Sequence, residues 1–235
     1  MGRMVIYTEN LTDSDLLLQA GSYKELFAGL KNMASDHVTK WDKASKSFDK
    51  FGRGTELRYG KYKRELFAKS RGKTLLAAAG TGLDFGFFPP GLEITAIDFS
   101  PKMLEKAAEK TKNHKGAIEL VKADVTDLQF GDNSFDTVVT SCTFCSVPDP
   151  VKGLRELNRV LKPDGRLLMF EHVRPTNFIL GAMMDILTPV VNKMGPDLNR
   201  RTADNIRKAG FSITREFNVY LDVVKLFEAR PITSG

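Results

Sequence analysis

Apolar and polar positions follow two distinct patterns along the chain from residue 74 onward. Short, almost continuously apolar runs end in a small or acidic residue, as strands buried in a parallel sheet do. Segments with a helical pattern lie between them. The runs are TLLAAAG (74–80), LEITAID (92–98), AIELVKAD (117–124), FDTVVTS (135–141) and, after a Pro163-Asp164-Gly165 turn, RLLMFEH (166–172). This alternation predicts an α/β fold with a parallel sheet and right-handed crossovers.

The helical segments carry start signals, and the end of the chain breaks the alternation. Ser100-Pro101 opens PKMLEKAAEK and Asp149-Pro150 opens VKGLRELNRVL, with proline in the first turn of each helix. After a helix over TADNIRKAG (202–210), the runs FSITREFNVY (211–220) and LDVVKLFEAR (221–230) follow each other directly. Since no crossover fits between them, these two strands must pair antiparallel.

The first seventy residues have a helical pattern throughout. Ser22-Tyr23-Lys24-Glu25 forms a capping box, and a stripe of apolar side chains follows it at Tyr23, Leu26, Phe27, Leu30 and Met33. The stripe either packs on the sheet, which we favour, or lies against a membrane or an apolar substrate. We expect a helical extension over residues 1–70 and a second domain over 71–235.

Composition places the chain among ordinary globular proteins, with 235 residues of which 42% are hydrophobic. No run of 18 apolar residues occurs, and the N-terminal residues lack the features of a signal peptide. The two cysteines cannot form a disulfide framework, which suits a reducing compartment. We therefore expect a cytoplasmic protein.

The net charge of +6 raises the question of an anionic partner. Basic residues are dispersed in short groups, KYKR (61–64), KNHK (112–115) and RR (200–201), with acidic residues between them. This dispersion disfavours nucleic acid as a partner. Solvated surface is the commonest explanation, and attraction to an anionic membrane surface is the second.

A glycine turn and an acidic residue point to a nucleoside ligand. Gly80-Thr81-Gly82 follows the first predicted strand, where backbone N–H groups can approach a ligand at the sheet's switch point. Asp98 ends the next strand, where a carboxylate can accept hydrogen bonds from both hydroxyls of a ribose. Asp124, beside the apolar Val125, ends the third strand and can accept from an adenine amino group. Together these positions predict a nucleoside site.

The same region argues against a dinucleotide. A dinucleotide site requires a third glycine that opens a long helix facing the pyrophosphate, but Phe85 stands at that position. Phe87-Phe88-Pro89-Pro90 then prevents a long regular helix. The pattern therefore favours S-adenosylmethionine, a nucleoside without phosphate, over NAD.

At these positions the chain resembles the class I S-adenosylmethionine-dependent methyltransferases. The resemblance covers residues 74–229 and is carried by GTG (80–82), AIDFSPKMLEKA (96–107), KADVTDLQFGDNSFDTVV (122–139) and LRELNRVLKPDGRLLMFEHV (154–173). Through FPPG, SCTFCSV and EHV it is similar to bacterial phospholipid N-methyltransferases and animal thiol methyltransferases, and more broadly to quinone C-methyltransferases. The resemblance implies a Rossmann-like seven-stranded, mostly parallel sheet that ends in an antiparallel hairpin.

The resemblance also implies a cofactor, S-adenosyl-L-methionine, and a product, S-adenosyl-L-homocysteine. Leu76 and Ala78 stand where the family usually has an acidic residue and an earlier glycine, so backbone carbonyls or a group from residues 41–59 must hold the methionine amino group. The expected cofactor-binding residues are Ala79, Gly80, Thr81, Gly82, Asp98, Phe99, Met103, Asp124, Val125, Ser141, Cys142 and Thr143.

Methyl transfer from a sulfonium requires mainly positioning and, for some acceptors, a base. Candidates at the ends of the fourth and fifth strands are Ser141, Cys142, Thr143, Phe144, Glu171 and His172, and His172 is the candidate catalytic base. The alternative role for His172 is to orient a loop. Cys142 and Cys145 form a C-x-x-C, but no other metal ligands accompany them, so we expect no metal and place them in the cofactor pocket.

The acceptor should be bound by segments outside the sheet. An apolar, methionine-bearing insert at 175–199 is either a packed cover helix or a lid over a hydrophobic acceptor. The expected acceptor contacts are Trp41, Tyr59, Phe144, His172, Met183 and Arg200. We rank a phospholipid amine first, then a small thiol, then a quinone ring. A non-catalytic cofactor-binding scaffold is the alternative from another class.

Overall fold

A computed structural model describes residues 38–46, 48–49, 54–55, 57–191 and 196–232. The chain divides into two units, Met1–Lys40 and Trp41–Gly235, and every strand belongs to the second. Residues 57–67 of this unit form a helix that precedes the sheet. The predicted stripe from Tyr23 to Met33 lies outside the described residues. The domain boundary expected at residue 70 stays a prediction.

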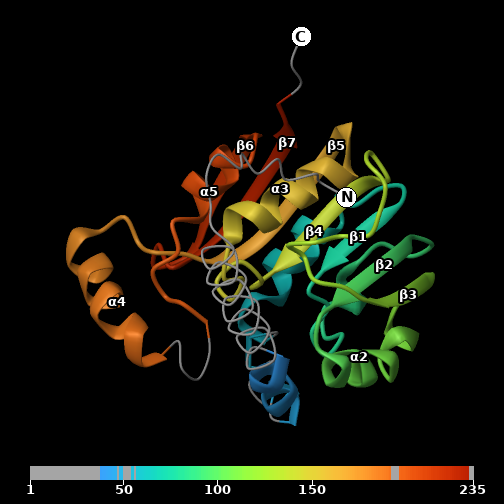
Figure 1. Cartoon of the computed structure of the whole chain (residues 1–235), viewed down its shortest axis with the longest axis horizontal. Helices are drawn as coiled ribbons and strands as arrows, with labels where there is room; N and C mark the ends of the chain where they lie inside the picture. Colours follow the sequence, from blue (N-terminus) through green and yellow to red (C-terminus); the bar gives the residue numbers. More distant parts are fainter. Residues whose placement is uncertain (1–37, 47, 50–53, 56, 192–195, 233–235) are drawn as a thin grey trace, which may run out of the picture. The chain divides into compact units, whose positions relative to one another are not determined.

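Seven strands form one sheet in the order β3-β2-β1-β4-β5-β7-β6 (Figure 1). Strands β1 to β5 pair in parallel, whereas β7 pairs antiparallel with both β5 and β6. The bounds are β1 Thr74–Ala77, β2 Glu93–Asp98, β3 Ala117–Lys122, β4 Phe135–Ser141, β5 Leu161–His172, β6 Phe211–Tyr220 and β7 Val224–Pro231. The predicted Rossmann-like sheet with a C-terminal antiparallel hairpin is confirmed.

The helices begin where the sequence signals place them. Ser100 Oγ accepts a hydrogen bond from the backbone N–H of Met103 at 3.2 Å, and Asp149 Oδ1 accepts one from that of Lys152 at 3.0 Å. The helices are α2 Pro101–Ala108, α3 Pro150–Val160, α4 Phe178–Val191 and α5 Thr202–Lys208, with short 3₁₀ turns η1 Phe85–Phe87 and η2 Thr111–Asn113. Turn η1 stands where the double proline was expected to prevent a long helix.

Strand β5 differs from its prediction, because it begins at Leu161 rather than after the Pro163–Gly165 turn. Leu161 pairs with Phe135 of β4, and the register then shifts before Thr137 pairs with Arg166. A β-bulge of this kind absorbs extra residues without ending the strand. The strand boundary predicted after Pro163-Asp164-Gly165 is therefore wrong, because these residues lie inside β5 where the register shifts.

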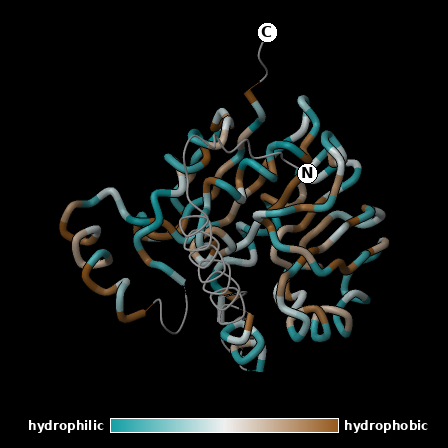
Figure 2. Tube along the Cα trace, viewed as in Figure 1, coloured by the Kyte–Doolittle hydropathy of each residue, from teal (hydrophilic) through white to brown (hydrophobic). Residues whose placement is uncertain are grey.

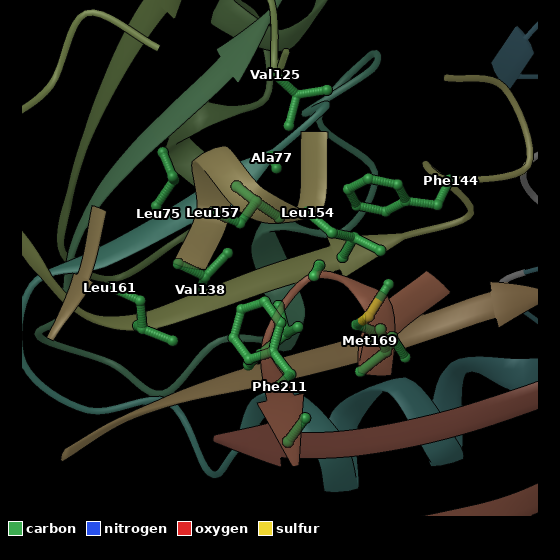
Figure 3. Packing of buried hydrophobic residues seen from close by; sticks show 14 of the residues in the cluster. Leu75, Ala77, Val125, Val138, Phe144, Leu154, Leu157, Leu161, Met169 and Phe211 are labelled. Carbon is green, nitrogen blue, oxygen red and sulfur yellow. The ribbon is translucent and has the colours of Figure 1, made fainter. Parts of the chain in front are cut away.

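The two faces of the sheet bury separate apolar clusters. Figure 3 shows Leu154 and Leu157 of α3 beside Val138 of β4 in the first cluster, which also contains Leu75. Since successive residues of a strand point to opposite faces, Leu76 belongs to the second cluster, with aromatic residues that precede and follow β1. None of the helices in the described ranges is long and apolar enough to cross a membrane.

Candidate active site

A cavity of about 380 Å³ lies at the carboxyl ends of β1, β2, β4 and β5. The strand order reverses between β1 and β4, and such a switch point leaves a crevice in open α/β sheets. The volume falls within the usual range for small-molecule sites. The predicted residues that line it are Trp41, Ala79, Gly80, Thr81, Asp98, Phe99, Met103, Ser141, Cys142, Thr143 and His172.

The loop after β1 contains three residues in the left-handed region, where a side chain is strained. Gly80 has φ +55° and Gly82 has φ +79°, whereas Ala78 adopts φ +59° without being glycine. A Cβ on Gly82 would lie 2.6 Å from Cε2 of Phe85. Gly82 is therefore needed for close packing behind the loop, while Gly80 lines the cavity itself.

Asp98 fixes this loop to the end of β2. Its Oδ2 accepts a hydrogen bond from the backbone N–H of Gly80, and its Oδ1 accepts one from that of Ser100, each at 2.9 Å. Burial raises the pKa of the Asp98 carboxyl, and the two N–H donors offset part of that rise. Because each carboxylate oxygen can accept more than one hydrogen bond, Asp98 retains capacity to accept from a ligand in the cavity.

Three residues predicted to bind the cofactor do not line the cavity: Gly82, Asp124 and Val125. Asp124 is exposed, and its Oδ1 accepts hydrogen bonds from the backbone N–H and the hydroxyl of Thr126 at 2.8 and 2.9 Å. Val125 is buried in the first apolar cluster. The role of Asp124 toward adenine stays a prediction.

Glu171 connects the end of β5 to the loop after β4. Its buried Oε1 accepts from the Thr140 hydroxyl at 2.7 Å and from the Thr143 backbone N–H at 3.2 Å. Its Oε2 accepts from the backbone N–H of Phe144 at 3.1 Å. Burial raises the pKa of Glu171 to about 7, although these hydrogen bonds favour the ionised form. Glu171 thus holds the loop that forms one wall of the cavity.

His172, the next residue, lines the cavity itself. Burial lowers the pKa of its imidazole, and the nearby cation of Lys63 lowers it further. The imidazole is therefore neutral at neutral pH. A neutral imidazole at a cavity wall is able to accept a proton from a bound molecule.

The two cysteines both line the cavity as protonated thiols. Burial raises the pKa of Cys142 to about 12, and it also raises the pKa of Cys145. Only the thiolate is a strong nucleophile or metal ligand, so neither side chain is activated for such chemistry. Cys142 also adopts φ +53°, so it is a second non-glycine residue of the cavity wall, in addition to Ala78, with a strained backbone.

Comparison with known proteins places this site in a family. A family described as "Methyltransferase domain" matches residues 75–169. The thiol S-methyltransferase TMT1B of Rattus norvegicus is 36% identical over 164 residues, which cover 64% of this chain and 67% of the relative. The chain belongs to the class I S-adenosylmethionine-dependent methyltransferases. The demethylmenaquinone methyltransferase of Staphylococcus aureus (strain Newman) is also similar to it, at 37% identity over 142 residues, 56% of this chain and 58% of the relative.

Solved structures share the fold of this methyltransferase. An S-adenosylmethionine-dependent methyltransferase of Methanosarcina mazei superposes with a TM-score of 0.56 at 18% identity, covering 72% of this chain and 96% of its own. The [4+2]-cyclase SpnF superposes with a TM-score of 0.61 at 18% identity, and the match covers 75% of this chain and 81% of the cyclase. At such identities the likeness concerns the fold alone, so it does not indicate the acceptor.

The cavity wall of the methyltransferase suits the family's cofactor. Gly80 offers bare backbone in a conformation that disfavours side chains, and Asp98 offers a carboxylate beside it. The hydroxyl of Ser141 is buried without a hydrogen-bond partner among the described residues, so it has capacity for a bound molecule. These groups fit a ligand that carries ribose hydroxyls.

Four residues predicted to contact the acceptor do not line the cavity of the methyltransferase: Tyr59, Phe144, Met183 and Arg200. Tyr59 packs on the ring of Phe170, with 5.6 Å between centroids, and Phe144 is buried in the first cluster. Met183 is exposed on α4. Arg200 pairs with Asp197 and donates to the carbonyl oxygen of Val147 at 2.9 Å.

Sequence reasoning missed a buried ion pair in the cavity wall. Lys63 Nζ lies 2.8 Å from Asp84 Oδ1, and only 9% of the lysine side chain is exposed. Lys63 comes from the helix before β1, outside every recognised motif, whereas Asp84 lies in the loop directly after the glycine turn. The loop position could have identified Asp84. Cys145 lines the cavity, as the sequence predicted, and the other missed lining residues are Phe48, Thr55, Ala78, Leu83, Ser146 and Pro196.

Proposed function

We propose that this methyltransferase methylates the sulfur of a small apolar thiol. The supporting observation is that the carboxylates in the cavity wall already have partners within the protein. Among the described lining residues these are Asp84 and Asp98, of which Asp84 pairs with Lys63 and Asp98 accepts from two backbone N–H groups. Asp84 is neutralised by Lys63, and the remaining acceptor capacity of Asp98 is assigned to the ribose, so neither carboxylate is left for a cationic acceptor.

The charge of the acceptor distinguishes a thiol from an amine. An alkylamine has a pKa of about 10 and arrives as an ammonium, whereas a thiol has a pKa of about 8.5 and arrives neutral. The Lys63–Asp84 pair at the cavity wall is neutral as a whole, so an ammonium acceptor would be desolvated there without a carboxylate partner of its own. A neutral thiol avoids this cost, which favours sulfur over nitrogen as the accepting atom.

In this reaction, different residues of the chain bind the cofactor, position a loop and accept the proton. When bound, S-adenosylmethionine supplies an activated methyl group on its sulfonium. Asp98 and the bare backbone of Gly80 bind the ribose part, and Ser141 offers its hydroxyl to the cofactor. Glu171 holds the loop after β4 in place. His172 accepts the thiol proton, which its lowered pKa permits at neutral pH.

A phospholipid amine, ranked first from the sequence, becomes the second candidate. The observation in its favour is the exposed apolar surface of helix α4, which suits a lipid. The name of the rat relative, a thiol S-methyltransferase, supports the thiol. The name of the staphylococcal relative keeps a quinol ring among the acceptors to be tested.

Turnover of labelled S-adenosylmethionine tests the proposal. The full chain is incubated with an alkane thiol, with phosphatidylethanolamine in detergent micelles, and with a demethylated menaquinol, and the methylated products are identified by mass. We expect S-methylation of the thiol at a kcat/KM at least tenfold above the values for the other two. Methylation of phosphatidylethanolamine without thiol turnover would replace sulfur by nitrogen as the accepting atom.

A further inference from the structure

Helix α4 exposes large apolar side chains along most of its length, and Figure 2 shows it as a largely brown helix that stands away from the sheet. Phe178 is 81% exposed, while Ile179 and Ile186 are each 76% exposed. A contiguous apolar surface of this kind is uncommon on soluble proteins and marks an interaction site. A helix that is apolar on nearly all sides also needs a cover, which water does not provide.

The charge of α4 is neutralised within the protein. Asp185 is the one charged residue between Phe178 and Val191. Arg174 binds it through Nε at 3.1 Å from Oδ1 and through a terminal guanidinium nitrogen at 2.8 Å from Oδ2. This pair fixes the helix to the segment after β5. The remaining surface of the helix is uncharged.

Both ends of α4 lead to the active-site cavity. His172 precedes the helix and Pro196 follows it, and both residues line the cavity. The chain therefore leaves the cavity wall, forms the apolar helix and returns to the same cavity.

The apolar surface continues onto the turn between β6 and β7. Leu221 in this turn is 65% exposed, and Tyr220, the last residue of β6, is 38% exposed. Asp222 Oδ2 accepts hydrogen bonds from the backbone N–H and the hydroxyl of Thr176, which precedes α4, at 2.5 and 2.6 Å. The turn is thus joined to the segment that precedes α4, and the exposed apolar side chains of α4 and of this turn are together called the α4 face.

We infer that this face docks on the surface of an anionic phospholipid membrane, with α4 lying in the interface. The 14 residues of α4 are about 21 Å long, shorter than the roughly 30 Å hydrocarbon core, so the helix is suited to lie on the membrane. The net charge of +6 and the exposed guanidinium of Arg201, whose charge also acts on Asp185 of α4, match anionic headgroups. The inference goes beyond the proposed function, because docking requires no acceptor.

Co-sedimentation of the full chain with vesicles tests the inference. Phosphatidylglycerol and phosphatidylcholine vesicles are compared at low and high salt, without cofactor or acceptor. We expect binding to phosphatidylglycerol that falls at high salt. Ile186→Ser should weaken it at least about threefold, and Phe178→Ser/Ile179→Ser/Ile186→Ser at least about tenfold.

Ile232→Ser provides the matched control. Ile232 is 61% exposed, but it lies beyond the far end of β7, about 26 Å along the strand from Val224. This variant should bind vesicles like the parent. Equal losses for Ile186→Ser and Ile232→Ser, or no sedimentation of the parent at low salt, would overturn the inference.

A second measurement covers the case in which the triple variant misfolds. An environment-sensitive dye on Ile186→Cys should shift to shorter wavelength with phosphatidylglycerol vesicles, whereas the same dye on Ile232→Cys should not. Burial raises the pKa of both native thiols, and Cys145 is also buried, so the exposed new cysteine should react with the dye first. No shift at either position, or a parent dimer that Ile186→Ser dissociates, would assign the face to something other than lipid.

The docking assay separates this inference from the proposed acceptor. Turnover of a soluble thiol without vesicles should be unchanged in the triple α4 variant if both proposals hold. Vesicle binding without thiol turnover would reject the acceptor alone, while thiol turnover without vesicle binding would reject the docking alone.

Discussion

The carboxylate of Asp98 accepts a hydrogen bond of 2.9 Å from the backbone N–H of Gly80, which joins the end of β2 to the loop after β1. The residue assigned to the ribose therefore also holds the loop that approaches the same ligand. A substitution of Asp98 removes two contributions at once. Its effect on the cofactor should exceed that of a carboxylate that binds ribose alone.

Asp98→Ala should weaken binding of S-adenosylmethionine and S-adenosylhomocysteine by roughly 2 to 4 kcal/mol. Each hydrogen bond to the charged carboxylate contributes about 1.5 to 3 kcal/mol, and water compensates in part. Isothermal calorimetry with both ligands measures the change. Asp124→Ala is the control and should cost less, because Asp124 is exposed and bonded to Thr126. Parental affinity in Asp98→Ala would reject its role at the ribose, and tight NAD binding by the parent would reject the choice of cofactor.

The region around Asp98 also shows what sequence patterns determine. The glycine turn and the acidic strand end are local signals with fixed spacing, so the loop, the strand and their junction could be predicted. Lys63 could not, because its burial depends on how the helix before β1 packs across a sheet whose strands come from distant segments. Long-range packing of this kind leaves no mark on local spacing.

Ala78→Gly should raise the free energy of unfolding by about 0.5 to 1 kcal/mol. Ala78 has φ +59°, a conformation that costs an L-residue about 1 to 2 kcal/mol, while glycine loses part of that gain through its greater freedom in the unfolded chain. Urea denaturation measures the difference. Ala77→Gly is the matched control, since Ala77 is a fully buried residue of β1 and should lose stability. Destabilisation of Ala78→Gly to the same extent would show that the strain is absent.

His172→Gln should lower kcat/KM for the thiol by about 10²- to 10⁴-fold, the range for loss of a general base. Cofactor affinity should stay close to that of the parent. Burial lowers the pKa of His172, so parental activity should be lost only as the pH falls below the ordinary histidine value of 6.5. The pH profile of kcat/KM with a saturating cofactor measures this loss. An unchanged kcat/KM in His172→Gln would leave His172 with a positioning role.

The acceptor side of the site could be predicted less completely than the cofactor side. His172 and Trp41 line the cavity, whereas Met183 projects from α4 and Arg200 is held by Asp197. The sequence marks the insert as apolar, but it does not determine whether those side chains turn toward the cavity or toward solvent. That choice depends on contacts such as Arg174 with Asp185, which position the whole helix.

Glu171 makes stability depend on pH in a direction that can be derived from its burial. Its folded-state pKa is about 7, above the ordinary value of 4.5, so the folded protein binds this proton more tightly than the unfolded chain does. The free energy of unfolding should therefore fall by about 3 kcal/mol as the pH rises from 4.5 to 7, and this contribution should level off above pH 7.

Urea denaturation of the parent and of Glu171→Gln at pH 5 and pH 8 measures it. At pH 5 the Glu171→Gln variant should be less stable than the parent, because glutamine has one acceptor fewer for the N–H groups of Thr143 and Phe144. Glutamine does not titrate, so this difference in the free energy of unfolding should shrink or reverse at pH 8. A difference that does not vary with pH would show that Glu171 is ionised throughout this range.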